Sequence, residues 1–190
     1  MEGDAFLWLV RHAVVDGVAG TIHASDAPAD LSDRPQLDAL RRHLPQDAAS
    51  YASPSRRTVD TARALGLDPV LVDEFREQDF GDWTGQRHDD LAATGGHEYA
   101  TFWNEPARSR PPRGESFEDQ IARVRRGLDR ITAGPATLVV HSGTIRAALS
   151  VALDLTPEAG LRFVIQPLSL TRIDRLSKGW RVVSVNQRLA

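Results

Sequence analysis

Two histidines in this 190-residue chain each follow a short apolar run that is typical of a buried β-strand. Arg11 and His12 follow residues 6–10, and His141 follows residues 136–140. Ligands of open α/β sheets bind outside the carboxyl ends of parallel strands, so two imidazoles at such ends can reach one site although they are far apart in sequence. The pair therefore indicates a chemical site at this edge of the predicted sheet.

Two turns add groups that suit an anion. Residues 53–62 place a strand end, a turn and a helix start together, with Arg56 and Arg57 beside the exposed amides of the helix N-terminus. Residues 141–146 form a second turn, of small residues, with free amides next to an imidazole. Taken alone, the first turn is more simply explained as a surface helix start with an incidental arginine pair. Together with the two histidines, both turns favour a phosphate site.

The composition excludes several kinds of phosphate chemistry. The chain has no cysteine, which rules out disulfides, thiolate metal sites and a cysteine nucleophile. Its single lysine, Lys178, lies in a turn near the end, so a Walker-type phosphate loop and a Schiff-base enzyme are both disfavoured. Any phosphate must then be bound by arginine, histidine and backbone amides.

Charge and hydropathy limit the partners. The formal net charge of −3 gives no overall basic field, so we expect no nucleic-acid partner. The N-terminal apolar run is too short for a signal peptide or a spanning helix, so we expect no membrane association and a cytoplasmic location. The sequence carries no readable sign of an oligomeric state.

The elements that must position these groups alternate between strand and helix. The length and the 41% hydrophobic content predict one domain over residues 1–190. A long loop over residues 16–32 and an irregular segment over residues 77–85 interrupt the pattern. We expect strands over residues 6–10, 49–52, 70–72, 136–140, 164–174 and 180–185, the last two as an antiparallel hairpin, and helices over residues 36–44, 59–65, 116–131 and 145–153.

Four motifs occur in a fixed order along the chain: Arg11-His12-Ala13, residues 53–62, residues 77–85 and residues 141–146. In this order they resemble the signature of the histidine phosphatase superfamily, and Gly114-Glu115-Ser116 before the long helix also matches. The resemblance spans nearly the whole chain, and the combination is specific although each motif alone is not. It implies the phosphoglycerate-mutase-like fold, which is an α/β fold with a three-layer α/β/α sandwich, a mostly parallel sheet and a C-terminal antiparallel hairpin.

The resemblance also implies a phosphatase mechanism without a metal or another cofactor, which acts on a small-molecule phosphate ester. His12 is expected to be the nucleophile that forms a phosphohistidine, and Glu77 is expected to protonate the leaving group and then activate water. Glu74 and Asp79 compete with Glu77 for that role. The residues expected to hold the phosphate oxygens are Arg11, Arg57, His141, Ser142 and Gly143.

Three positions near the first histidine depart from the family pattern. Ala13 replaces the usual glycine, which is a small change. Val15 and Val18 replace the threonine and asparagine that often help to line the phosphate pocket. The candidates for supplying these polar contacts from the same loop are Thr21, His23 and Ser25.

Hydrolysis is favoured over mutase activity because the segment that a mutase extends with basic residues is short here, over residues 95–113. Its Arg108, Arg110 and Arg113 either contact an acidic substrate or lie in a mobile, solvated loop. We assign Arg108 and Arg113 as candidate substrate-binding residues.

Among the phosphatases, the Arg11-His12-Ala13 start and the run over residues 79–85 look most like α-ribazole phosphatases of cobalamin biosynthesis. Trp83, a candidate substrate-binding residue, either packs against a benzimidazole-like base with Phe102 and Trp103 or belongs to the core. A broad-specificity phosphatase for sugar phosphates or other small molecules, or a phosphoglycerate mutase-like enzyme, is the alternative.

Two hypotheses come from other classes. Metal-dependent hydrolysis could use His12 and His141 with acidic ligands, but neither His-x-Asp nor His-Glu-x-x-His spacing occurs and arginines adjoin the candidate ligands. A non-catalytic module that binds a phosphate ligand is disfavoured because His12, Arg57, Glu77 and His141 are all present.

Overall fold

The computed structural model describes residues 3–94 and 96–189, which form a six-stranded sheet with the order β3-β2-β4-β1-β5-β6. The first four strands in this order run parallel to their neighbours, whereas β5 is antiparallel to β1 and β6 is antiparallel to β5. The expected mostly parallel sheet with a C-terminal hairpin is confirmed. The strands are β1 (Ala5–Arg11), β2 (Ala49–Ala52), β3 (Val70–Leu71), β4 (Gly134–Val140), β5 (Leu170–Leu176) and β6 (Gly179–Gln187).

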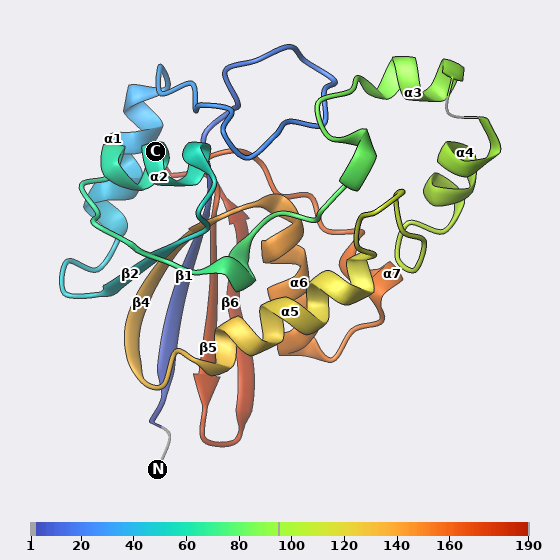
Figure 1. Ribbon diagram of the computed structural model, residues 1–190. Coiled ribbons are helices and arrows are strands. Elements are labelled where there is room, and N and C mark those ends of the chain that lie inside the picture. Colours follow the sequence, from blue (N-terminus) through green and yellow to red (C-terminus); the bar gives the residue numbers. More distant parts are fainter. Residues whose placement is uncertain (1–2, 95, 190) are drawn as a thin grey trace.

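Helices cover both faces of the sheet (Figure 1). Neighbouring strand residues point to opposite faces, so Val10 packs with one helix layer and Leu9 with the other. This arrangement gives the expected three-layer α/β/α sandwich. One face carries α1 (Arg34–His43) and α2 (Arg56–Ala64), and the other carries α5 (Phe117–Asp129), α6 (Ser142–Leu153) and the short α7 (Pro157–Gly160).

Two helix starts matter for the site. α5 begins with a capping box in which the Ser116 hydroxyl accepts from the Asp119 amide and the Asp119 carboxylate accepts from the Ser116 amide. α6 begins at Ser142, three residues before the predicted start, because the small-residue turn continues directly into the helix with His141 at the cap position. The first turn of α6 therefore lies beside the end of β4.

The strand predicted over residues 164–174 begins only at Leu170. Pro167 has no N–H to donate to a neighbouring strand, and Leu168 has a φ of 54°, which no regular strand contains. The Leu168 amide instead donates to the Arg11 carbonyl at 3.0 Å, which ties this turn to the end of β1.

The loop expected over residues 95–113 is partly helical. Gly95 lies outside the described residues, but α4 spans Gly96–Asn104 and follows α3 (His88–Thr94). Tyr99 and Phe102 of α4 are buried against Trp83 and Leu91 in a small cluster of their own. We call residues 80–113 the cap segment; Figure 1 shows α3 and α4 beyond the end of the sheet.

The cap segment enters and leaves the body at one crossing of the chain. Gly81 has a φ of 52° and lies so close to the Pro112 carbonyl that a side chain would overlap it. The Glu115 amide donates to the Asp79 carbonyl at 2.9 Å across the same crossing. The two connections are therefore held against each other by their backbones. None of the described helices has the length and apolarity that a membrane span requires.

Candidate active site

The two histidines meet because β1 and β4 are adjacent and parallel. Arg11 is in register with Val140, and the His12 amide donates to the Val140 carbonyl at 2.9 Å. The ring centroids of His12 and His141 lie 5.1 Å apart in an edge-to-face arrangement, and both side chains are buried. The prediction that the strand ends converge is confirmed at the level of geometry.

The hydrogen bonds of His12 indicate its tautomer. Its Nδ1 lies 2.6 Å from the carbonyl oxygen of Ala13, which can only accept, so Nδ1 carries the proton and Nε2 keeps its lone pair. Burial, followed by the positive field of His141, Arg57 and Arg11, holds the pKa of His12 well below its usual value. The ring is therefore neutral at neutral pH, with a free nitrogen.

His141 is completely buried beside it. Its Nε2 lies 2.8 Å from the Ser53 hydroxyl, whereas its Nδ1 has no hydrogen-bond partner among the described residues. Burial and then the charges of Arg57 and Arg11 lower the pKa of His141 well below its usual value. An unpaired buried ring nitrogen is costly, and an oxygen of a bound anion would satisfy it.

Three guanidinium groups lie near the histidines or near Glu77, and each is anchored by a backbone carbonyl. Arg57 donates to Ala24 at 2.8 Å and Arg11 donates to Ile165 at 2.6 Å, while the Nε of Arg11 has no partner among the described residues. Burial lowers the pKa of both groups, and the Glu77 carboxylate opposes that shift. These cations are thus held away from bulk water, where their attraction for a dianion is strong.

Arg146 is the third cation, and sequence reasoning assigned it no role. Its Nε donates to the Phe163 carbonyl at 2.8 Å, and burial lowers its pKa against the opposing effect of Glu77. Arg146 belongs to the motif over residues 141–146, so the sequence contained the residue. Its place near Glu77 depends on the packing of α6 beside β1, which the motif does not reveal.

Glu77 is the carboxylate that the structure brings to this site. Its Oε1 accepts from the Gln78 amide at 3.1 Å and from Gln120 Nε2 at 3.3 Å, and its Oε2 faces the Gly143 amide at 3.4 Å. Glu74 instead pairs with Arg130 at 2.7 Å, outside the cleft around His12. Asp79 lines the cleft but accepts from its own turn, at the Gly81 amide.

A cleft of about 640 Å³ opens onto these groups. Arg11, His12, Arg57, Glu77 and Ser142 form part of its lining, and His141 lies behind them. The cap segment supplies another part of the wall. The cleft residues from that segment are Phe80, Thr84, His88, Trp103 and Arg113.

The geometry brings a neutral imidazole, buried arginines and a carboxylate together at one cleft. The sequence comparison identifies the family. The sequence model of the histidine phosphatase superfamily (branch 1) matches residues 7–188. The chain belongs to this superfamily. The predicted family and fold are both confirmed.

Individual relatives of this histidine phosphatase carry different names. The adenosylcobalamin/α-ribazole phosphatase of Escherichia coli is 26% identical over 97% of this chain and 92% of its own length. A 2,3-bisphosphoglycerate-dependent phosphoglycerate mutase of a Bradyrhizobium strain is 37% identical over 84% of this chain and 86% of its own length. The α-ribazole phosphatase structure from Shigella flexneri has a TM-score of 0.84 with 24% identity, covering 97% of both chains, which shows the fold alone.

A further match is more local. A bifunctional protein of Mycobacterium tuberculosis is 44% identical over 115 residues, which are 56% of this chain and 31% of that protein. The chain thus spans about a third of the length of this relative.

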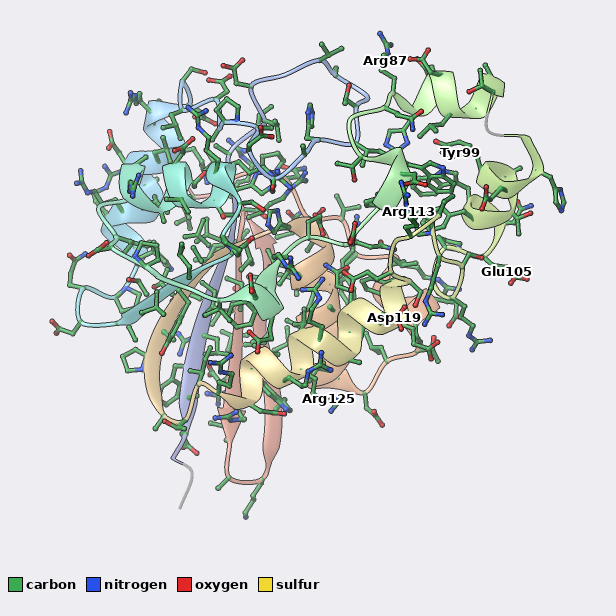
Figure 2. All side chains as sticks on the ribbon, in the orientation of Figure 1. Arg87, Tyr99, Glu105, Arg113, Asp119 and Arg125 are labelled. Atoms are coloured by element: carbon green, nitrogen blue, oxygen red, sulfur yellow. The ribbon has the colours of Figure 1, made fainter. Side chains whose placement is uncertain are left out.

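The candidate substrate residues of this histidine phosphatase lie in different places. Arg113 lines the cleft and pairs with Asp82 of the cap segment; Figure 2 labels it between this segment and α5. Trp83 is buried in the aromatic cluster of the cap segment, behind the cleft wall. Arg108 is not part of the cleft lining, and its Nε lies 3.6 Å from Glu158.

The loop over residues 14–32 supplies polar groups to the cleft. Thr21, His23 and Ser25 all line it, as does Val15, whereas Val18 is exposed and outside it. The described residues contain no cluster of three or more histidine, aspartate or glutamate side chains placed to hold a metal. The charge around His12 comes from arginines instead.

Proposed function

We propose that this protein is a phosphomonoester hydrolase that works through a phosphohistidine on His12. The observation that carries the proposal is the His12 ring, which keeps a free Nε2 lone pair beside Arg11 and Arg57 in an open cleft. A neutral imidazole is the nucleophilic form of histidine, and the arginines supply the positive charge that phosphoryl transfer requires.

The first step transfers the phosphoryl group. The Nε2 lone pair of His12 forms an N–P bond while the P–O bond to the leaving group breaks, and Glu77 gives its proton to the departing oxygen. Arg11 and Arg57 bind the phosphate oxygens, and the unpaired Nδ1 of His141 donates to one of them. The hydroxyl of Ser142 and the amide of Gly143 lie beside Glu77, where they bind the leaving side of the group.

The second step returns the enzyme to its starting state. A water oxygen attacks phosphorus, Glu77 accepts the proton of that water, and the N–P electron pair returns to His12 as inorganic phosphate leaves. The same carboxyl group therefore acts first as an acid and then as a base. The three arginines neutralise the charge throughout, which is the task of metal ions in other phosphoryl-transfer enzymes.

For the substrate we propose α-ribazole 5′-phosphate, a primary alkyl phosphate that carries a planar base. The name of the E. coli relative supports this substrate, and so does the cleft wall, where Trp103 is 46% exposed beside His88 and Phe80. An exposed indole in a cleft wall suits the face of an aromatic base.

Broad-specificity phosphatase activity is the main alternative, and mutase activity is a second one supported by the name of the Bradyrhizobium relative. The cap segment decides against the mutase in our proposal, because most of its arginines are engaged. Arg113 pairs with Asp82, Arg110 with Asp119 and Arg108 with Glu158.

Steady-state hydrolysis of a panel of phosphate esters in EDTA tests the proposal. The panel contains α-ribazole 5′-phosphate, sugar phosphates, 3-phosphoglycerate and p-nitrophenyl phosphate, and it is assayed with the wild type and with His12→Ala. We expect chelator-resistant turnover that is selective for α-ribazole 5′-phosphate and is lost in the variant. Broad, weak turnover would be consistent with the proposed mechanism but would refute α-ribazole 5′-phosphate as the substrate. Activity that survives His12→Ala would refute the mechanism.

A further inference from the structure

The two oxygens of Glu77 have different surroundings. Oε1 accepts two N–H groups, from the Gln78 amide at 3.1 Å and from Gln120 Nε2 at 3.3 Å. Oε2 has only distant neighbours, the Gly143 amide at 3.4 Å and the Ser142 hydroxyl at 3.5 Å. A proton on Oε1 would point at groups that can only donate, so the acid form of Glu77 carries its proton on Oε2.

The Gln120 side chain has one orientation in which its contacts make chemical sense. Its Nε2 also lies 3.3 Å from the Arg76 carbonyl, which can only accept, so the amide nitrogen must face Arg76 and Glu77. Its own oxygen then has no donor among the described residues, although the side chain is completely buried on α5. A buried glutamine that leaves one polar atom unpaired is a poor structural choice, which indicates a functional reason for it.

We infer that Gln120 is a positioning residue for proton transfer, which keeps the proton of Glu77 on Oε2, the oxygen beside Ser142 at the cleft wall. The inference rests on the proposed function, because it assigns a device to the acid of the first step. It adds to the mechanism a residue that never touches the substrate. Without the Gln120 donor, Oε1 and Oε2 compete for the proton, and part of the enzyme holds it on the wrong oxygen.

Gly143 keeps this contact in place from the other side. A Cβ at this position would overlap Glu77 Oε1 and would lie 2.8 Å from the Gln120 oxygen. The glycine therefore leaves the carboxyl and the amide free to meet.

The charged groups that face Glu77 are Arg11 on β1, Arg57 on α2 and Arg146 on α6.

The backbone that carries Glu77 is anchored without Gln120. Arg123, also on α5, donates to the carbonyls of Glu74 at 2.8 Å, Arg76 at 3.1 Å and Glu77 at 3.4 Å. The Thr144 hydroxyl lies 3.1 Å from the carbonyls of Phe75 and Arg76. Loss of the Gln120 amide therefore leaves the Arg76 carbonyl paired and the segment in place.

A leaving-group comparison separates proton delivery from structure. Gln120→Met keeps the length of the side chain and removes both polar atoms. The rate of phosphoenzyme formation is measured by rapid quench with p-nitrophenyl phosphate, whose leaving group needs no proton, and with the primary alkyl phosphate that the wild type turns over fastest. We expect the alkyl rate to fall about tenfold or more and the aryl rate to stay within about twofold, since only the alkyl ester needs the acid.

Thr144→Val is the matched control because it loosens the same segment without reaching the carboxyl group. Because only the alkyl ester needs the acid carried by this segment, Thr144→Val should lower the alkyl rate more than the aryl rate, but by much less than Gln120→Met does. An alkyl-selective loss as large as that of Gln120→Met would refute the inference. Gln120→Glu is the second variant if Gln120→Met does not fold; a carboxyl group at this position competes for the proton, so the alkyl rate should again fall more than the aryl rate. Equal losses for both esters in the Gln120 variants, or no loss, would refute the inference alone. A wild type that forms no phosphoenzyme would refute the proposed function and this inference with it.

Discussion

The strand-end site and the cap segment are built in opposite ways. The site groups lie at the ends of β1 and β4 and at the starts of α2 and α6, and its arginines are each tied to a backbone carbonyl. The cap segment is stabilised by packing among its own aromatic rings: the Trp83 ring centroid lies 5.2 Å from those of both Tyr99 and Phe102. The imidazoles and arginines of the site are therefore held by the sheet edge and by backbone carbonyls, whereas the cap segment is a separate small cluster.

This difference suggests a division of labour. A change to His12 or to the arginines around it should affect every phosphate ester equally, because each ester presents the same phosphoryl group. A change in the cap segment should affect esters unequally, because only the leaving group reaches Trp103 and His88. Single substitutions on the two sides can break or sharpen this comparison.

The largest effect is expected for His12→Ala. Removal of the nucleophile should lower kcat by at least about 10³-fold for every ester in the panel, because the phosphohistidine cannot form. His88→Ala is the matched histidine change in the cap segment, since His88 lines the same cleft. It should change the ranking of esters with kcat largely retained for the smallest, as measured by steady-state kinetics. A uniform loss in His88→Ala would contradict the division.

Gly143→Ala is expected to have the next largest effect. The added Cβ overlaps the Glu77 carboxylate, which must therefore shift from its present position. We expect kcat to fall by about 10- to 100-fold for alkyl esters, because displacing a reacting group by about an ångström costs that much. Ser142→Ala removes a contact to the same carboxylate and adds no atom, so it should cost less. A smaller loss in Gly143→Ala than in Ser142→Ala would show that Glu77 tolerates the displacement.

The sequence predicts groups at strand ends more readily than groups whose place depends on helix packing. His12 and His141 were predictable because adjacent parallel strands convert a pattern in the chain into proximity. Gln120 and Arg146 were not, because their roles depend on how α5 and α6 pack around Glu77. Such packing has no local signal in a single sequence.

The cap segment had a signal that the sequence interpretation did not use. Tyr99, Phe102 and Trp103 have the spacing of one helix face, and α4 carries all three. The surrounding glycines and polar residues favoured a loop instead. Similarly, Pro167 was a readable reason to begin the last hairpin later. Trp83 was predicted either to contact substrate or to belong to the core, and its burial places it in the cluster.

Two aromatic residues of α4 test the cap segment itself. Trp103 is 46% exposed in the cleft wall and Phe102 is 2% exposed beneath it. Trp103→Ala should raise KM severalfold for esters with a planar base and leave small esters unchanged, with little loss of stability. Phe102→Ala should instead destabilise the cluster by about 3 kcal/mol, which is typical for a buried ring. Steady-state kinetics and thermal unfolding of both variants distinguish a residue that contacts the substrate from one that only supports the cluster. Equal KM changes for all esters in Trp103→Ala would refute the assignment of Trp103 as a contact for the planar base.

The last prediction concerns the pH dependence of stability, which should come from the strand-end site. Burial and the nearby positive charges hold the pKa of His12 and His141 well below 6.5, the value expected in the unfolded chain. Below pH 6.5 the unfolded state therefore binds more protons, and the free energy of unfolding falls as the pH falls. The slope approaches about 1.4 kcal/mol per pH unit for each imidazole that stays neutral.

Urea unfolding between about pH 5 and pH 7 measures this slope. His141→Gln should reduce it, whereas His43→Gln, at an exposed position on α1, should not. A slope unchanged by His141→Gln would mean that this imidazole is charged in the folded protein.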